Sequence, residues 1–190
     1  MGGRGSSSSS RKGNTDAARA AALAASVVNP HYESGALKWK INCQRCVYAY
    51  EMNRRGNGVY EAQPNIEGAF DRYDYYAYGG WRNVMEGQTV QKVGSPSRKK
   101  VMTNIDELTT KWGDGSRGIV KVQWKHGKSG HVFNFERING KTRYFDAQVG
   151  KEININDYLA VAKPTRTEIS RTDNLEFKRE HLDNCVKRVK

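Results

Sequence analysis

The sequence predicts an α+β fold in which one helix packs on a three-stranded antiparallel meander. Two patterns predict it. Residues 42–55 show the period of an amphipathic helix. The side chains on its expected inner face are Cys43, Cys46, Val47, Tyr50 and Arg54. Residues 118–146 instead form three β-rich runs, and Asn139-Gly140 between the last two is typical of a type I′ hairpin turn.

The N-terminal region divides into two expected parts. Residues 1–16 are mainly Gly, Ser and charged residues, so we expect a disordered arm that buries too little to offset its ordering entropy. Residues 17–30 are alanine-rich and predict a helix with Thr15 as its N-cap and Asp16 in its first turn. Asn29-Pro30 marks its end.

The next elements are assigned from capping residues. Asn42 suits the N-cap of the helix over 42–55, and Gly56 suits a left-handed C-cap. Residues 60–100 show no sustained period and predict loops with one or two short elements, including a tyrosine cluster at 73–78. A second helix is expected over 105–112, with Asn104 as N-cap and Gly113 closing it.

The hairpin turn fixes which side chains of the meander share a face. With Asn139-Gly140 as a two-residue turn, Ile138 faces Lys141, and counting outward places His131 opposite Gln148. The same count places His131 and Asp146 as diagonal neighbours on one face. We expect the helix over 42–55 to dock on this face, whose apolar residues are Phe133, Phe135 and Tyr144.

This docking would bring a nucleophile to a base. Cys43 stands in the first turn of its helix, where the helix dipole and unpaired N–H groups favour a thiolate. His131 can then act as the general base, and Asp146 can orient it. The free N–H groups of the first turn can also stabilise an oxyanion.

Four segments of the sequence are similar to motifs of one protein family. Asn42 to Glu51 resembles an NCxxC helix, Ser116 to Val120 an SRGIV strand, Gly130 to Asn134 a GHVFN strand and Asp146 to Gly150 a DxQxG segment. Together they resemble the papain-fold toxin domains, which are glutamine deamidases of bacterial polymorphic toxins. The resemblance covers about residues 41–150.

The resemblance implies a papain-like catalytic domain over residues 31–162. Residues 163–190 alternate in charge and have few apolar residues, so we expect an appended basic extension that the motifs do not cover. It implies Cys43 as nucleophile, His131 as base and Asp146 as orienting acid, with Asn42 and Gln148 as further residues that hold the substrate or the oxyanion. It implies neither a cofactor nor a metal. Toxin domains usually end a much longer polypeptide, whereas this chain has 190 residues.

The resemblance also implies an activity and partners. We expect a cysteine-dependent amidohydrolase that converts glutamine side chains of a target protein through a thioester. A protein inhibitor would be a second partner. The same groups would serve a cysteine peptidase or a transglutaminase. The sequence has neither a signal peptide nor an apolar run long enough for a membrane span, so we expect action in the cytoplasm of a target cell after delivery.

Two readings without this catalysis stay open. A net charge of +12 suits a basic structural or nucleic-acid-associated protein. However, segments 1–30, 31–112, 113–162 and 163–190 each carry +3, so no single segment forms a basic patch. A zinc site is the other reading, made of Cys43, Cys46, His181 and Cys185. It would leave the arrangement of His131 and Asp146 unexplained.

Overall fold

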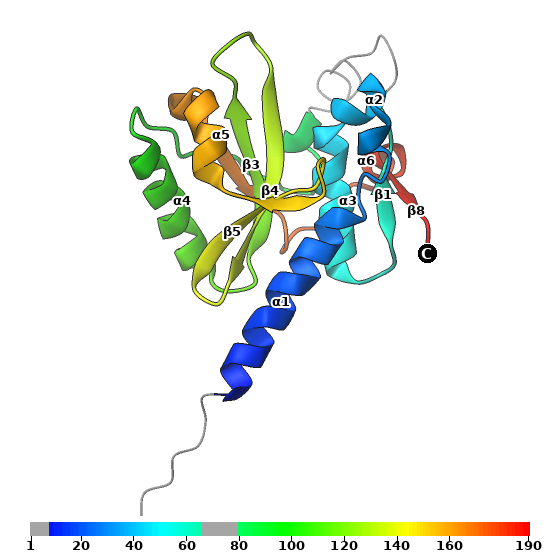
Figure 1. The fold of residues 1–190 in the computed structure, drawn as a ribbon, viewed down its shortest axis with the longest axis horizontal. Helices are drawn as coiled ribbons and strands as arrows, with labels where there is room; N and C mark the ends of the chain where they lie inside the picture. Colours follow the sequence, from blue (N-terminus) through cyan, green and yellow to red (C-terminus); the bar gives the residue numbers. More distant parts are fainter. Residues whose placement is uncertain (1–7, 66–79) are drawn as a thin grey trace, which may run out of the picture.

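The computed structural model describes residues 8–65 and 80–190, and its centre is a six-stranded antiparallel sheet (Figure 1). The strands lie in the order β2-β7-β3-β4-β5-β6. Their bounds are β2 Gln91–Lys92, β7 Glu168–Arg171, β3 Arg117–Gln123, β4 Gly130–Ile138, β5 Lys141–Asp146 and β6 Lys151–Ile153. The predicted meander is thus the β3-β4-β5 part of a larger sheet.

Helices cover both faces of this sheet (Figure 1). On one face lie α1 (Ser8–Ser26) and α3 (Cys43–Arg55), and on the other lie α4 (Arg98–Trp112) and α5 (Ile155–Val161). The remaining elements are η1 Tyr32–Ser34, α2 Leu37–Lys40, β1 Tyr60–Ala62, η3 Gly80–Arg82, η4 Pro164–Arg166, α6 Arg179–Cys185 and β8 Val186–Arg188. None of the helices in the described ranges has the length and apolar content needed to cross a membrane.

The predicted hairpin and its register are confirmed. Asn139 and Gly140 have φ values of 53° and 74°, as a type I′ turn requires at both central positions. Ile138 pairs with Lys141, and the ladder continues in that register to the far end of the paired region. The local turn chemistry therefore sets which side chains of β4 and β5 share a face.

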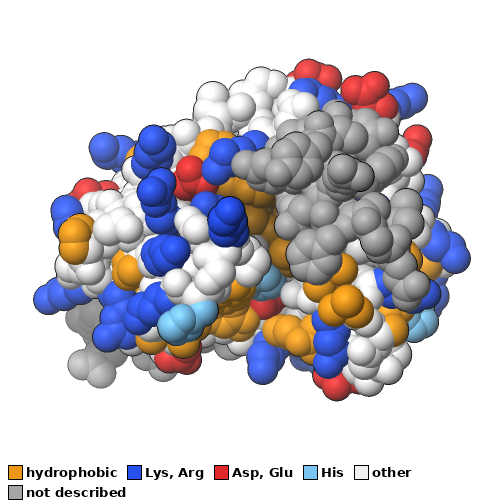
Figure 2. Space-filling model, turned by 90° about the horizontal axis from the view of Figure 1, so that it is seen from above, with side chains coloured by type: hydrophobic (Ala, Val, Ile, Leu, Met, Phe, Trp, Pro, Cys, Tyr) orange, Lys and Arg blue, Asp and Glu red, His pale blue; other side chains and the backbone are white. Residues whose placement is uncertain are grey.

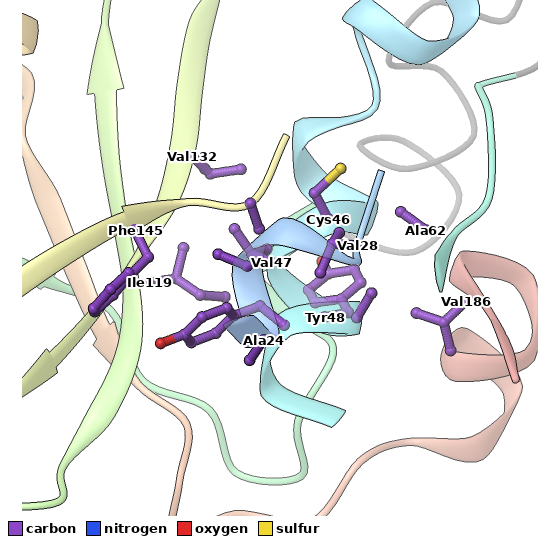
Figure 3. Close-up of a cluster of buried hydrophobic side chains, with 14 of the residues drawn as sticks. Ala24, Val28, Cys46, Val47, Tyr48, Ala62, Ile119, Val132, Phe145 and Val186 are labelled. Carbon is purple, nitrogen blue, oxygen red and sulfur yellow. The ribbon is translucent and has the colours of Figure 1, made fainter. Parts of the chain in front are cut away.

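The predicted docking face of the cysteine-bearing helix is wrong. Phe133, Phe135 and Tyr144 pack in the core under α4 and α5. The helix α3 packs on the opposite face, where Val47 lies among Val132 and Phe145 (Figure 3). Every residue of β4 from His131 to Ile138 is buried, so both faces of this strand carry core residues. Because both faces of β4 are apolar, the sequence pattern could not show which face is covered by α3.

Two helix starts differ from the prediction, and two helix ends agree with it. The helix α4 begins after Ser97, whose side chain accepts from the Lys100 N–H, and Asn104 lies inside it. The helix α1 begins at Ser8, so Thr15 is an interior residue and not the N-cap. Gly113 follows α4, and Gly56 closes α3 with φ 78°, as predicted. The first turns of α1 and α4 are polar and show no hydrophobic periodicity, so both helices were predicted to start too late in the chain.

Parts of two predicted regions lie outside the described residues. The predicted arm over 1–16 is described only from Ser8 onward, where it is helical. The described part of the region 60–100 contains the short elements β1, η3 and β2 and the start of α4, which is more than the one or two short elements predicted. The tyrosine cluster at 73–78 is not among the described residues.

Residues 163–190 are part of the fold and not an appended extension, because they supply strands to both sheets. The strand β7 lies between β2 and β3 in the main sheet, and Ile169 is fully buried there. Further along, β8 pairs with β1, and Cys185 and Val186 join the core around α3. These few apolar residues lie among many charged ones, which hid the strand in the sequence.

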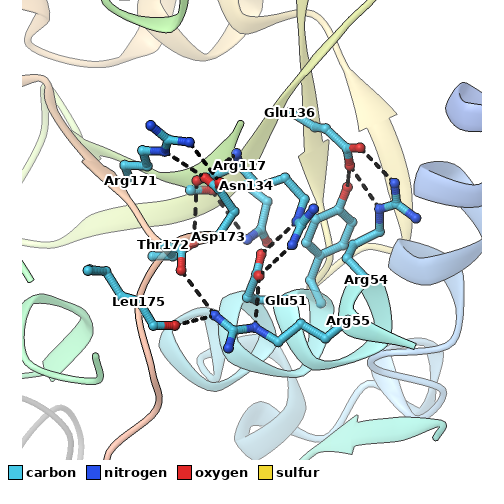
Figure 4. A network of polar contacts seen from close by, with 12 residues as sticks. Glu51, Arg54, Arg55, Arg117, Asn134, Glu136, Arg171, Thr172, Asp173 and Leu175 are labelled. Atoms are coloured by element: carbon cyan, nitrogen blue, oxygen red, sulfur yellow. Dashed lines mark hydrogen bonds and ion pairs between the residues drawn. The ribbon is translucent and has the colours of Figure 1, made fainter. Parts of the chain in front are cut away.

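A network of ion pairs fixes α3 against the sheet (Figure 4). The Glu51 carboxylate is almost fully buried and binds Arg55 of its own helix and Arg117 of β3, at 3.1 and 2.8 Å. Glu136 of β4 binds Arg54 through both oxygens and accepts from the Tyr50 hydroxyl. Paired charges on both sides of the interface set the rotation of α3 about its axis, and hence the direction in which its first residue points.

Candidate active site

A histidine and an aspartate meet where β4 begins and β5 ends. His131 Nε2 lies 2.8 Å from Asp146 Oδ2, and both side chains are buried. The predicted diagonal contact across the hairpin is therefore present. The Gln148 backbone N–H donates to the other carboxylate oxygen, Oδ1, at 3.0 Å. Because each carboxylate oxygen has a hydrogen-bond partner, the orientation of the Asp146 carboxylate is fixed.

Cys43 comes to the same ring from another direction. It is the first residue of α3, is partly exposed, and lines the same pocket as His131, where its sulfur helps to raise the pKa of the ring. Because Asp146 engages Nε2, the nitrogen left for the sulfur is Nδ1. The structure thus brings together the three predicted side chains, in the order sulfur, imidazole and carboxylate. It does so although α3 lies on the other face of the sheet, because the meeting point is at the end of the strands.

The charges of the three groups support one another. Burial alone would lower the pKa of His131, but the Asp146 carboxylate and the Cys43 sulfur outweigh it and raise this pKa to about 10. Burial would raise the pKa of Asp146, whereas the imidazolium and the Tyr158 and Gln148 donors lower it. At neutral pH the ring is therefore protonated beside a charged carboxylate.

The three side chains line a pocket of about 520 Å³. This volume lies within the range of small-molecule sites. Tyr32, Lys40 and Ile41 line one side, and Trp124, Tyr158 and Val161 line the other. Figure 2 looks onto the end of the molecule where the β3-β4 turn and α2 lie, and shows hydrophobic side chains in a central hollow with Lys and Arg side chains beside it. The pocket is open to a side chain presented from outside.

Residues 41–151 match the family described as papain fold toxin 1, glutamine deamidase. This chain belongs to that family. The match covers more than half of the chain and contains the four motifs that predicted it. Searches of curated proteins and of solved structures give no match. The mixed helices and antiparallel sheet agree with the papain-like fold that the sequence predicted.

The two further residues of the predicted site occupy different places. Gln148 lines the pocket, and its Nε2 donates to Asn42 Oδ1 at 3.2 Å. Asn42 is fully buried beneath the pocket, and its side chain does not cap α3. Asn29 joins them, because its Nδ2 donates to the Gln148 carbonyl at 3.0 Å and to Asn42 Oδ1 at 3.3 Å. Asn42 therefore lies behind Gln148 and not on the pocket wall.

Three residues near this deamidase-family site were missed by the sequence analysis. The Trp124 ring stacks on His131, with 5.8 Å between centroids and 16° between planes. The Tyr158 hydroxyl donates to Asp146 Oδ2 at 2.6 Å. Asn29, taken only as part of a break, is the third. Trp124 ended a predicted strand and was a detectable candidate, whereas Tyr158 and Asn29 reach the site only through tertiary packing.

Cys46 is a core residue. Its side chain is almost fully buried, and its thiol donates to Asn42 Oδ1 at 3.4 Å. Burial raises the pKa of this thiol well above its usual value, so Cys46 is poorly suited to act as a second nucleophile.

Within the described residues, His, Cys, Asp and Glu side chains form no group of three or more that could hold a metal ion. The His181 side chain is outside that description.

Proposed function

We propose that this protein is a cysteine-dependent amidohydrolase that deamidates glutamine side chains of a target protein. The observation that supports it is the row of sulfur, imidazole and carboxylate at the floor of an open pocket. Membership of the glutamine deamidase family supports the choice of a carboxamide as substrate. A protein target in the cytoplasm of another cell fits the toxin character of this family.

The reaction would proceed in two halves. In the first, the Cys43 thiolate attacks the carboxamide carbon of glutamine, and the C–N bond breaks as the His131 imidazolium gives its proton to the departing nitrogen. Ammonia leaves and a thioester remains. In the second, the neutral His131 takes a proton from water, the hydroxide attacks the thioester, and the C–S bond breaks. The products are glutamate and the regenerated thiolate-imidazolium pair.

The oxyanion of each tetrahedral intermediate needs hydrogen-bond donors. Gln148 is suited to this role, because one Nε2–H binds Asn42 and the other is available on the pocket side. The N–H groups in the first turn of α3 are a second source. Asn42 would then contribute by holding the Gln148 amide, and Asn29 by holding Asn42.

The proposal is tested by the products formed from whole-cell protein extracts. We expect free ammonia and a mass increase of about 1 Da at one or a few glutamines, measured by peptide mass spectrometry. Cys43→Ser and His131→Ala are expected to lower both signals by at least about 10³-fold. Cys185→Ser, which changes a thiol outside the pocket, is the matched control and should retain them.

The same experiment separates the related reactions. A transglutaminase would release ammonia but join glutamine to an amine, and a peptidase would cut the backbone without releasing ammonia. If either of these activities is found and Cys43→Ser abolishes it, Cys43 is still the nucleophile, but deamidation is refuted. If Cys43→Ser has no effect on any product, the protein is not this enzyme, and a basic binding protein becomes the reading to test through salt-dependent nucleic-acid binding.

Gln148 gives a separate prediction. Gln148→Ala removes the proposed oxyanion donor, so we expect kcat for ammonia release to fall by about 10²-fold to 10³-fold. The thermal midpoint of unfolding, followed by circular dichroism, should change much less than activity. An unchanged kcat would refute the assignment of Gln148, whereas the role of Cys43 would stand.

A further inference from the structure

Tyr158 lines the pocket and has no role in the chemistry proposed so far. It lies on α5, beyond the segment 41–151 that matches the family. Its hydroxyl donates to Asp146 Oδ2, the same oxygen that His131 Nε2 contacts. Two donors therefore share one carboxylate oxygen, and one of them is the ring proposed to deliver the proton.

Tyr158 is held firmly in this position. The Lys125 N–H donates to the Val161 carbonyl at 3.0 Å, and the Lys163 N–H donates to the Gln123 carbonyl at 2.7 Å. These bonds tie the end of α5 to the end of β3. On its inner side, the Tyr158 ring packs edge-on against Phe133, with 5.3 Å between centroids. The hydroxyl thus arrives at Asp146 from a backbone that is fixed to the central sheet.

The same ring helps to enclose the histidine. The centroids of Tyr158 and His131 lie 5.8 Å apart, and Trp124 stacks on His131 at the same centroid distance. Trp124 and Tyr158 also contact each other. The imidazole therefore has aromatic neighbours that limit water around its bond to Asp146. In such surroundings, each hydrogen bond to the carboxylate has a large effect on its charge distribution.

We propose that Tyr158 is a positioning residue: its hydroxyl fixes the Asp146 carboxylate, and thereby sets the orientation of His131 and how readily this ring gives up its proton. The proposal rests on the proposed function in that His131 is the general acid. Tyr158 acts through Asp146, so it needs no contact with the reacting atoms.

The direction of the effect follows from charge. A hydroxyl donor draws negative charge on Asp146 toward itself and leaves less for the imidazolium, so its removal strengthens the pair between Asp146 and His131. The ring then holds its proton more tightly and protonates ammonia more slowly. The ionisable side chains that face His131 or line its pocket are Cys43 of α3, Asp146 of β5, Tyr158 and Asp157 of α5, Lys40 of α2 and Tyr32 of η1.

The test uses Tyr158→Phe in the full chain and needs no substrate. The titration of His131 is followed by NMR of the ring, with His131→Gln used to assign the signal. We expect the midpoint in Tyr158→Phe to rise by roughly half a pH unit. Tyr144→Phe is the matched control, because Tyr144 packs in the same core cluster as Tyr158 but makes its ring contact with Phe133 and not with His131. Its midpoint should equal that of the original protein.

A purely structural role predicts a different result. It would lower the thermal midpoint of Tyr158→Phe while leaving the His131 titration unchanged, and that outcome would overturn the proposal, as would a downward shift. In the ammonia assay, Tyr158→Phe is expected to be about 3-fold to 10-fold slower. If Cys43→Ser leaves ammonia release intact, the proposed function fails, but the titration still decides the role of Tyr158.

Discussion

His131 shows how far single residues could be predicted. Its contact with Asp146 followed from the Asn139-Gly140 turn, because a two-residue turn fixes the pairing of every residue in the ladder. No comparable rule links position 158 to position 146, since a loop, a short strand and a helix intervene. The sequence therefore predicts the contact between His131 and Asp146, whereas the residues that surround this pair are identified only in the three-dimensional structure.

The raised pKa of His131 gives a prediction about pH. In the proposed mechanism the protonated ring releases ammonia, so the rate should fall as pH rises through about 10. Asp146→Asn removes the carboxylate that is the main cause of the increase, and we expect this alkaline limit to move to lower pH with a loss in kcat of about 10³-fold or more. A pH-rate profile measures both. An alkaline limit that stays in place in Asp146→Asn would contradict the assignment.

The same pKa also concerns stability. A group whose pKa is raised by folding contributes stability that is complete below its unfolded value, here 6.5, and is lost as pH rises through about 10. We therefore expect the free energy of unfolding to fall between these values more steeply in the original protein than in His131→Gln. Urea denaturation at a series of pH values measures the difference, and parallel curves would exclude a protonated His131 in the folded state.

At the scale of elements, α3 was predicted in place and length but not in its docking face. Its periodicity predicted one buried side, whereas every residue from Gln44 to Met52 is buried, and β4 of the meander is buried on both of its sides. The choice between the two faces depends on charged partners that are distant in sequence. Glu51 needs Arg117, and Arg54 needs Glu136, and both pairs form only with α3 on the face that it occupies. Ion pairs between single residues that are distant in the chain produce no periodic pattern in the sequence, so they could not be predicted from it.

Glu51 gives the matching prediction. Glu51→Gln removes a buried carboxylate and leaves Arg55 and Arg117 with weaker partners, so we expect a loss of about 3 kcal/mol in the free energy of unfolding. Glu107→Gln is the control, because Glu107 meets Lys100 at an exposed site, 4.0 Å away, and should cost about 0.5 kcal/mol or less. Chemical denaturation measures both, and equal losses would refute a buried clamp at Glu51.

At the scale of the whole molecule, the central meander was predicted and the completed sheet was not. The strand β7 has four residues, and Ile169, which faces the core, is its single large apolar side chain. A single apolar residue in a charged segment is no strand signal by periodicity. Its place in the sheet comes instead from backbone hydrogen bonds to β3 and β2. Any extended segment can form such bonds, so they leave no pattern in the sequence.

The position of β7 predicts the effect of a truncation. Removal of residues 167–190 would expose one edge of β3 and uncover the core around Ile169, so we expect loss of cooperative thermal unfolding and of activity. An extension that was merely appended would leave both intact. Ile169→Asp in the full chain should have the same direction of effect. A truncated chain with an unchanged thermal midpoint would refute the integral role of this segment.

The placement of β7 has a consequence for synthesis. A chain that emerges from the ribosome from its N-terminus exposes Cys43, His131 and Asp146 well before Glu168–Arg171. Until that strand emerges, β3 has an unsatisfied edge and the sheet that carries the histidine is unfinished. Cys43 and His131 are therefore translated early but become a stable pair late, so a nascent chain is expected to lack the proposed deamidase activity.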